Sequence, residues 1–196
     1  MMEPMDHIID AGSLAQADSF ALQQTSTMLS NDMSVTTADG TPVATVVTRG
    51  GGLSRMLMGA REFDVLDARG DRVLFRLSDP ATLGRDVYSM TGPHGEPLAQ
   101  LRQELSLMRT AVSVRVADGT AYTVTGNLFD HDYQMVAGEV PIARVTAEFR
   151  GLMKLLRGRS AYRLDLDPQM PPVVRCAVLG TAVALDLIRA KRSRSS

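Results

Sequence analysis

One apolar stretch near the end of the chain, from Cys176 to Ile188, constrains the fold more than any other feature. It reads CAVLGTAVALDLI, thirteen residues with Asp186 inside the run and Arg175 and Arg189 just outside it. A helix that is apolar on every side belongs inside a protein or inside a bilayer. A bilayer span takes about 20 such residues, whereas runs of roughly 10–14 are more often core helices. We therefore expect a core helix that is wrapped by the β-structure preceding it.

The composition is that of one domain with a real core. The chain has 196 residues, of which 44% are hydrophobic and 5% aromatic, so Val, Leu, Ala and the 12 Met must fill the interior. The one cysteine, Cys176, cannot form an internal disulfide, and its place in the apolar run predicts a buried structural thiol rather than a nucleophile. The opening residues, MMEPMDHIIDAGS, lack the basic and apolar regions of a signal peptide, so the expected location is the cytoplasm.

The chain divides into three parts. Residues 1–18 are polar and without periodicity, which predicts a frayed leader, and residues 191–196 form a basic tail. Between them, residues 19–190 read as successive hairpins of a single mainly β domain. Alternating strands flank five glycine-bearing turns, at 38–41, 68–71, 93–96, 117–120 and 136–139. Such turns need a positive φ, which glycine adopts without strain.

Three connectors between the hairpins, 52–57, 104–109 and 151–157, combine apolar residues with a neighbouring cation. The favoured interpretation is a barrel corner capped by an arginine or lysine. An amphipathic loop that contacts a membrane has the same pattern and stays open as an alternative.

Several of these segments together resemble a known family. They are 63–67 with 73–76, 126–133, 144–149, 159–166 and the terminal helix. Their order is similar to that in the LURP-one-related family of the tubby C-terminal-like superfamily, which also contains the phospholipid scramblases, and the similarity runs from about Ser19 to Arg189. The resemblance implies a closed antiparallel barrel of about twelve strands around a central C-terminal hydrophobic α-helix. The chain departs from the family in its glycine-rich connector 49–52, and in having only Phe149 where relatives often carry Trp.

The sequence offers little catalytic chemistry. Asp130, His131 and Asp132 are consecutive, and successive strand residues face opposite ways, so a polar turn is favoured over a metal or acid–base cluster. No nucleophile elbow, phosphate loop or His/Cys metal spacing is present, and we expect no enzyme activity, no cofactor and no metal. Asp186 and Arg189 are expected to form a structural i, i+3 pair near the barrel mouth.

Charge is unevenly distributed along the chain. Residues 150–196 hold ten Lys or Arg against three Asp, although the whole chain has a net charge of −1. One interpretation of this excess of cations is a solvated tail together with cations in loops. The alternative is a surface that binds anionic partners. Nucleic acid is not expected, because no aromatic stacking platform accompanies the cations.

The resemblance favours a function at membranes, since tubby-type domains bind phosphoinositide head groups and scramblase relatives act on phospholipids. We expect a non-enzymatic protein of the cytoplasm that is peripheral at the membrane and binds anionic phospholipid head groups. Each cation near such a surface contributes about 1 kcal/mol. The candidate head-group ligands are Lys154, Arg157, Arg159, Lys191, Arg192 and Arg194. The alternative is a soluble structural or protein-interaction scaffold.

Overall fold

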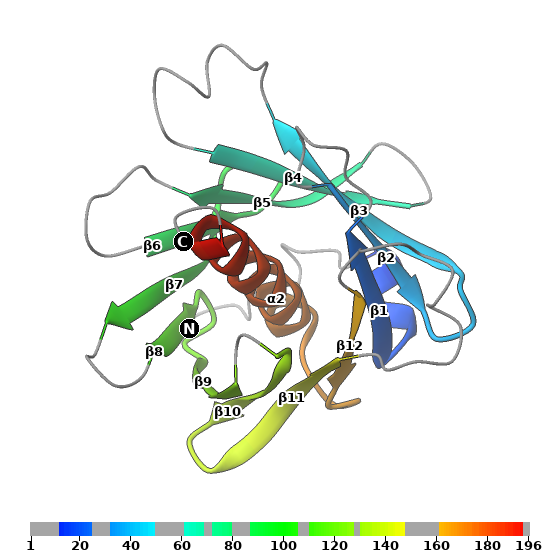
Figure 1. Ribbon diagram of the computed structural model, residues 1–196. Coiled ribbons are helices and arrows are strands. Elements are labelled where there is room, and N and C mark those ends of the chain that lie inside the picture. The colour runs from blue at the N-terminus through cyan, green and yellow to red at the C-terminus, as the bar shows by residue number, and fades with distance from the viewer. Residues whose placement is uncertain are drawn as a thin grey trace, which may run out of the picture.

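Figure 1 shows the computed structural model of the chain, in which a ring of strands surrounds one long helix. The structure describes residues 12–24, 32–49, 61–68, 72–79, 87–105, 110–127, 130–147 and 161–193. Two helices are described, the 3-10 helix η2 (Gly12–Gln16) and the α-helix α2 (Pro172–Ser193). The strands are β1 (Ser19–Gln24), β2 (Met33–Thr37), β3 (Pro42–Arg49), β4 (Arg61–Asp67), β5 (Val73–Asp79), β6 (Val87–Thr91), β7 (Pro97–Leu105), β8 (Thr110–Val116), β9 (Ala121–Asn127), β10 (Asp132–Ala137), β11 (Val140–Ala147) and β12 (Ala161–Leu166).

The strands form one closed antiparallel barrel. Each strand pairs with its neighbours in chain order, and β1 pairs with β12 to close the ring. Closure leaves no strand edge with unpaired backbone groups, which protects the sheet from pairing with other chains. The expected fold, a mainly β barrel of about twelve strands around a C-terminal helix, is confirmed.

The tight turns follow the glycine pattern. Gly40, Gly95, Gly119 and Gly138 all have positive φ, and each stands in one of the expected turns. The fifth expected turn, 68–71, lies outside the described residues apart from Ala68. Register shifts occur next to four of the turns, in β2, β4, β6 and β10. Such bulges add local twist, which helps a sheet to curve into a barrel.

The helix α2 passes through the middle of the barrel (Figure 1). Every residue from Val173 to Ile188 is buried, because the barrel wall surrounds the helix on all sides. A helix without a polar face suits such a position. The expected helix was shorter, beginning at Cys176, and the structure extends it by about a turn at each end. Cys176 itself is buried, as expected.

Close packing brings α2 against β5 and β6. A Cβ atom added at Gly180 would lie 2.6 Å from Met90 Sδ and 3.0 Å from Phe75 Cε2. Glycine therefore allows the helix to approach the wall at this point. On another side, the Tyr122 hydroxyl lies 2.9 Å from Thr181 Oγ1, which also donates to the carbonyl of Ala177 at 2.8 Å. A buried hydroxyl pair is thus satisfied within the core.

The N-terminal segment is more ordered than the frayed leader expected for residues 1–18. Leu14 in η2 is 1% exposed, and the Ser13 hydroxyl donates to Asp67 at 2.9 Å. The buried guanidinium of Arg175 donates to the carbonyl of Ala17 at 2.9 Å and to Asp18 Oδ1 at 2.6 Å. The described part of the leader is therefore packed against the barrel, through contacts between residues that lie more than 50 positions apart in sequence. Residues 1–11 lie outside the described residues.

The topology gives the barrel two unlike ends. Tight turns lie at the end where α2 begins, because β12 finishes there and the helix follows it. The odd-numbered strands finish at the other end, which we call the exit end because α2 leaves the barrel there. The expected connectors 52–57 and 151–157 join strands at the exit end but lie outside the described residues. The connector 104–109 does so too, except for the backbone of Glu104 and Leu105 at the end of β7.

Candidate anion-binding surface

The six cations expected from the sequence do not form a site in the described structure. Lys154, Arg157, Arg159 and Arg194 lie outside the described residues. Lys191 and Arg192 belong to the last turn of α2, where only the backbone is described. The helix therefore continues through the first half of the expected basic tail, and the head-group site expected at these six cations stays a prediction.

Most arginines with described side chains are paired with carboxylates. Arg163 lies 2.7 Å from Asp165, and Arg76 lies 3.3 Å from Asp64. The other pairs are Arg49 with Glu62 and Asp64, Arg72 with Asp67, Arg144 with Asp132, Arg175 with Asp18 and Arg189 with Asp186. A paired arginine has part of its charge neutralised and its donors occupied, which weakens its attraction for another anion.

Arg102 and Arg115 are different. Both are exposed, and neither contacts a carboxylate of the residues that the structure describes. They stand on adjacent strands, β7 and β8, with Arg102 opposite Ser113 and Arg115 opposite Gln100. This register places the arginines on a diagonal, where neighbours stand roughly 7–8 Å apart and their Cβ atoms somewhat closer. Two long guanidinium side chains at that separation can reach one anion.

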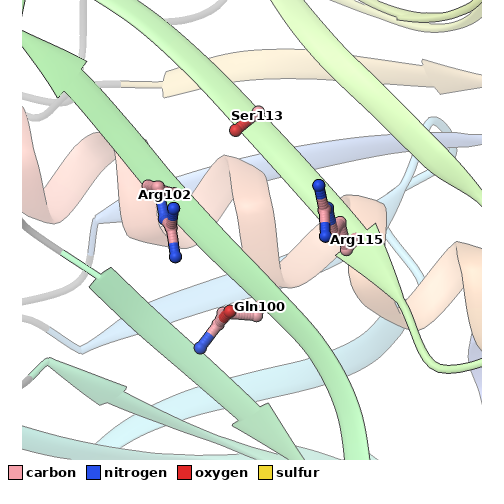
Figure 2. Close-up of a pocket in the computed structure, with 4 residues that line it drawn as sticks. All are labelled: Gln100, Arg102, Ser113 and Arg115. Carbon is pink, nitrogen blue, oxygen red and sulfur yellow. The ribbon is translucent and has the colours of Figure 1, made fainter.

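The four side chains line a shallow hollow on the outer wall of the barrel (Figure 2). Its volume is about 110 Å³. Gln100 and Arg102 alternate with the buried Leu101 on β7, and Ser113 and Arg115 alternate with buried valines on β8. The outward direction of these polar side chains follows directly from the two-residue period of a strand.

The hollow has uncharged surroundings on both sides. On β6, Val87 lies opposite Arg102 and Ser89 lies opposite Gln100. On β9, Thr123 lies opposite Ser113 and Ala121 lies opposite Arg115. The cross-strand neighbours therefore supply no negative charge to offset the two guanidinium groups.

The sequence contained part of this signal. The alternation of Val112, Val114 and Val116 shows that Ser113 and Arg115 face outward, and β7 shows the same for Arg102. What the sequence could not show is that the two arginines share a diagonal, because that depends on the β7–β8 register. It also could not show that they lack carboxylate partners while other arginines have them.

A second polar cluster lies inside the barrel near the exit end. His131, in the turn before β10, is 7% exposed and has a positive φ of 51°. Its ring stacks on Tyr162 with centroids 4.3 Å apart. Asp130 and Asp132 are exposed while His131 is buried, so the three do not form a cluster, in agreement with the predicted polar turn. The turn nevertheless places one of its side chains in the core.

The partners of His131 come from α2. Its Nε2 lies 3.3 Å from Asp186 Oδ1, and the Nη1 of Arg189 lies 2.8 Å from its Nδ1 and 2.7 Å from its Nε2. Because a guanidinium only donates, a ring protonated on Nε2 can donate to Asp186 and accept from Arg189 at Nδ1, and the approach of Nη1 to Nε2 is then a contact between two donors rather than a hydrogen bond. The expected Asp186–Arg189 pair is present at 4.0 Å. Sequence reasoning missed His131 as their partner because it stands 55 residues before Asp186.

This buried cluster holds the helix in the barrel. Burial, followed by the nearby charge of Asp186, raises the pKa of Tyr133 and of Tyr162, so both phenols stay protonated well above their ordinary range. The hydrogen-bonding and stacking partners named above for His131, which are Asp186, Arg189 and Tyr162, belong to α2 and β12. The cluster therefore joins the turn before β10 to the last buried turn of the helix, and we interpret it as structural.

Across the described ranges, no group of three His, Cys, Asp or Glu side chains is placed to hold a metal ion. None of the described helices combines the length and the apolar character that a membrane crossing requires.

Fold and surface together define a class: a closed twelve-stranded β-barrel plugged by its own C-terminal helix, with an arginine-lined hollow on the wall. The family model described as LURP-one-related matches residues 19–186. The chain therefore belongs to the LURP-one-related family.

The barrel is similar to a solved structure. A protein from Arabidopsis thaliana, determined by X-ray crystallography, superposes with a TM-score of 0.56 at 10% sequence identity, covering 86% of this chain and 91% of that one. At this identity the similarity shows the fold alone. No curated protein is significantly similar to the chain in sequence.

Proposed function

We propose that this LURP-one-related barrel is a non-enzymatic cytoplasmic protein, peripheral at the membrane, that binds anionic phospholipid head groups. The observation that carries the proposal is the pair of arginines, Arg102 and Arg115, that face one hollow and contact no carboxylate in the part of the chain that the structure describes. The resemblance to superfamily members that bind or act on phospholipids points to the same class of ligand. The described residues that support the proposal thus differ from the cations first expected.

The magnitude of the attraction is modest. Two cations near an anionic membrane surface contribute about 1 kcal/mol each, so the pair raises partitioning by roughly 30-fold. Binding of this strength is reversible and falls as salt screens the surface. Other cations of the chain, such as Lys154 and Arg157, would add to it where they reach the same membrane surface.

A matched control is available in the same barrel. Arg144 and Arg163 form another diagonal pair on adjacent strands, since Arg144 lies opposite Asp165 and Arg163 opposite Thr146. Their side chains are 56% and 48% exposed, but each contacts a carboxylate, Asp132 and Asp165 respectively. Removing either diagonal pair lowers the net charge by two, so a difference between them reports on the site rather than on total charge.

The test is co-sedimentation with vesicles of phosphatidylcholine alone or with added phosphatidylserine, at low and high salt. We expect the wild-type protein to bind the anionic vesicles at low salt and the Arg102→Gln/Arg115→Gln variant to bind them roughly 30-fold more weakly. The Arg144→Gln/Arg163→Gln variant should lose much less. Failure of the wild-type protein to bind anionic vesicles at low salt would refute the proposal and favour the scaffold alternative. Equal losses in the two variants would refute the role of this site.

A further inference from the structure

The hollow between β7 and β8 has features that go beyond a general attraction for anions. Its volume of about 110 Å³ is well below the roughly 300–1,000 Å³ of pockets that enclose whole organic ligands. A sugar, a nucleotide or a complete head group does not fit within it. A single compact group, such as one phosphate, does.

Its lining consists of hydrogen-bond donors that are not used elsewhere. Each guanidinium carries five N–H donors, the Ser113 hydroxyl carries one and the Gln100 amide carries two. No side-chain hydrogen bond to the described residues engages Arg102, Arg115, Ser113 or Gln100, although many other polar side chains on the barrel wall are engaged. The four occupy the corners of a cross-strand square, with the arginines on one diagonal. An anion at the centre would have a donor at each corner.

Charge distinguishes two kinds of phosphate. A phosphomonoester carries about −1.5 to −2 charges near pH 7 and three free oxygens, whereas a phosphodiester carries one charge and two free oxygens. Two guanidinium groups match the charge of the monoester, and a square of donors can serve three oxygens better than two. The monoester group also stands at the end of its molecule, so it can enter a shallow hollow without a second substituent to accommodate.

We infer that the Gln100–Arg102–Ser113–Arg115 hollow is a phosphomonoester site that prefers a terminal phosphate group to the diester phosphate of ordinary phospholipids. This inference rests on the proposed function for its membrane setting, where the ligand is a lipid of the phosphatidate type. The same chemistry is offered by a free phosphomonoester in solution. The experiment must therefore separate the lipid from the soluble source.

The first arm compares vesicles containing phosphatidate with vesicles containing phosphatidylglycerol, adjusted to equal surface potential. We expect the wild-type protein to bind phosphatidate vesicles about tenfold more tightly, which corresponds to about 1.4 kcal/mol. The second arm measures binding of glycerol 3-phosphate by isothermal titration calorimetry, and its competition with phosphatidate vesicles. A lipid site predicts weak binding of the soluble compound and partial competition.

Three variants test whether the side chains of the hollow produce the preference for phosphatidate. Arg115→Lys keeps the charge but loses the planar fork that contacts two oxygens, so it should retain binding to phosphatidylglycerol and lose most of the preference for phosphatidate. Ser113→Ala removes one donor without changing charge and should reduce the preference in part. Thr123→Ala removes the exposed hydroxyl opposite Ser113, outside the hollow, and serves as the control. All three positions lie on the outer wall, and circular dichroism checks that the variants fold.

The outcomes separate the two proposals. Equal binding to phosphatidate and phosphatidylglycerol would overturn the monoester inference and leave the anionic-lipid function in place. Binding of glycerol 3-phosphate without binding to any vesicle would support the monoester site and overturn the membrane function. A phosphatidate preference that persists in Arg115→Lys and Ser113→Ala would place the selectivity elsewhere and overturn the assignment of these residues.

Discussion

Leu185 offers a direct test of whether the barrel depends on its helical plug. The residue lies near the exit end of α2 and is 5% exposed, one position before the buried Asp186. Asp186 is tolerated because His131 and Arg189 face it. A second carboxylate at position 185 would replace a side chain that belongs to the hydrophobic core. We therefore expect Leu185→Asp to be severely destabilising.

The expected loss in the free energy of unfolding of Leu185→Asp has two parts. Losing the burial of a leucine side chain costs about 1.5–3 kcal/mol. Keeping the new aspartic acid protonated at pH 7 means raising its pKa by about three units from the ordinary value near 3.9, which costs about 4 kcal/mol. The total of about 6 kcal/mol is comparable with the roughly 5–15 kcal/mol that stabilises a typical protein. For a chain of this size it corresponds to a fall in Tm of roughly 12–24 °C.

The pH dependence separates the two parts. A buried aspartic acid has a folded-state pKa above its unfolded value, so the ionisation penalty is complete at pH 7 and disappears below about pH 4, where the carboxyl is protonated in both states. The difference in Tm between Leu185→Asp and Leu185→Met should therefore narrow as the pH falls towards 4. Only the smaller loss of apolar burial should remain at that pH.

The assay is thermal unfolding followed by far-ultraviolet circular dichroism, at pH 7 and pH 4. Leu185→Met is the matched control, because a swap that conserves volume costs less than about 1.5 kcal/mol. If Leu185→Asp melts within a few degrees of Leu185→Met at pH 7, the side chain at 185 is not buried and the helix is not the core of the barrel.

Two predictions concern other parts of the core. His131→Ala should destabilise the protein by about 1–3 kcal/mol in chemical denaturation, because it leaves Asp186 buried with a weaker partner, whereas the exposed Asp132→Ala should change stability by less than about 0.5 kcal/mol; equal effects would contradict the buried cluster. Burial raises the pKa of Tyr122, Tyr133 and Tyr162, so their contribution to stability is complete below about pH 10 and is lost as the pH rises above it, where the unfolded chain ionises first. Tyrosinate absorbance should therefore appear in the same steep transition as the loss of β-sheet circular dichroism, and a gradual titration of folded protein would refute this.

Local signals in the sequence were sufficient for the turns, the strands and the core helix, whereas the closed barrel was implied by the family resemblance. Each described turn glycine, such as Gly40 or Gly119, acts within four residues, because a positive φ at one position sets the geometry of the whole turn. The alternation along β8 likewise depends only on neighbouring residues. Residues 12–18 differ from the expected frayed leader for the opposite reason: Leu14 and Ser13 lack periodicity, and their burial comes from contacts with distant parts of the barrel.

The candidate site likewise depends partly on local sequence signals and partly on contacts between distant residues. The outward direction of Arg102 and Arg115 is a local property of their strands, but their diagonal is not. It follows from the pairing of β7 with β8, where a slip of one residue would separate the two charges. Their lack of carboxylate partners depends further on what β6 and β9 place beside them.

The sequence by itself therefore determined that thirteen apolar residues would form a core helix, and that glycine turns and alternating strands would form β-hairpins that wrap it, whereas the closed barrel was implied by the family resemblance. The helix and the hairpins are properties of short segments, governed by hydrophobic period and turn geometry. Only the tertiary structure decided which charges meet. His131 joins Asp186 and Arg189, while Arg102 and Arg115 have no carboxylate partner among the described residues, because register and the rotation of α2 within the barrel set distances between residues far apart in the chain.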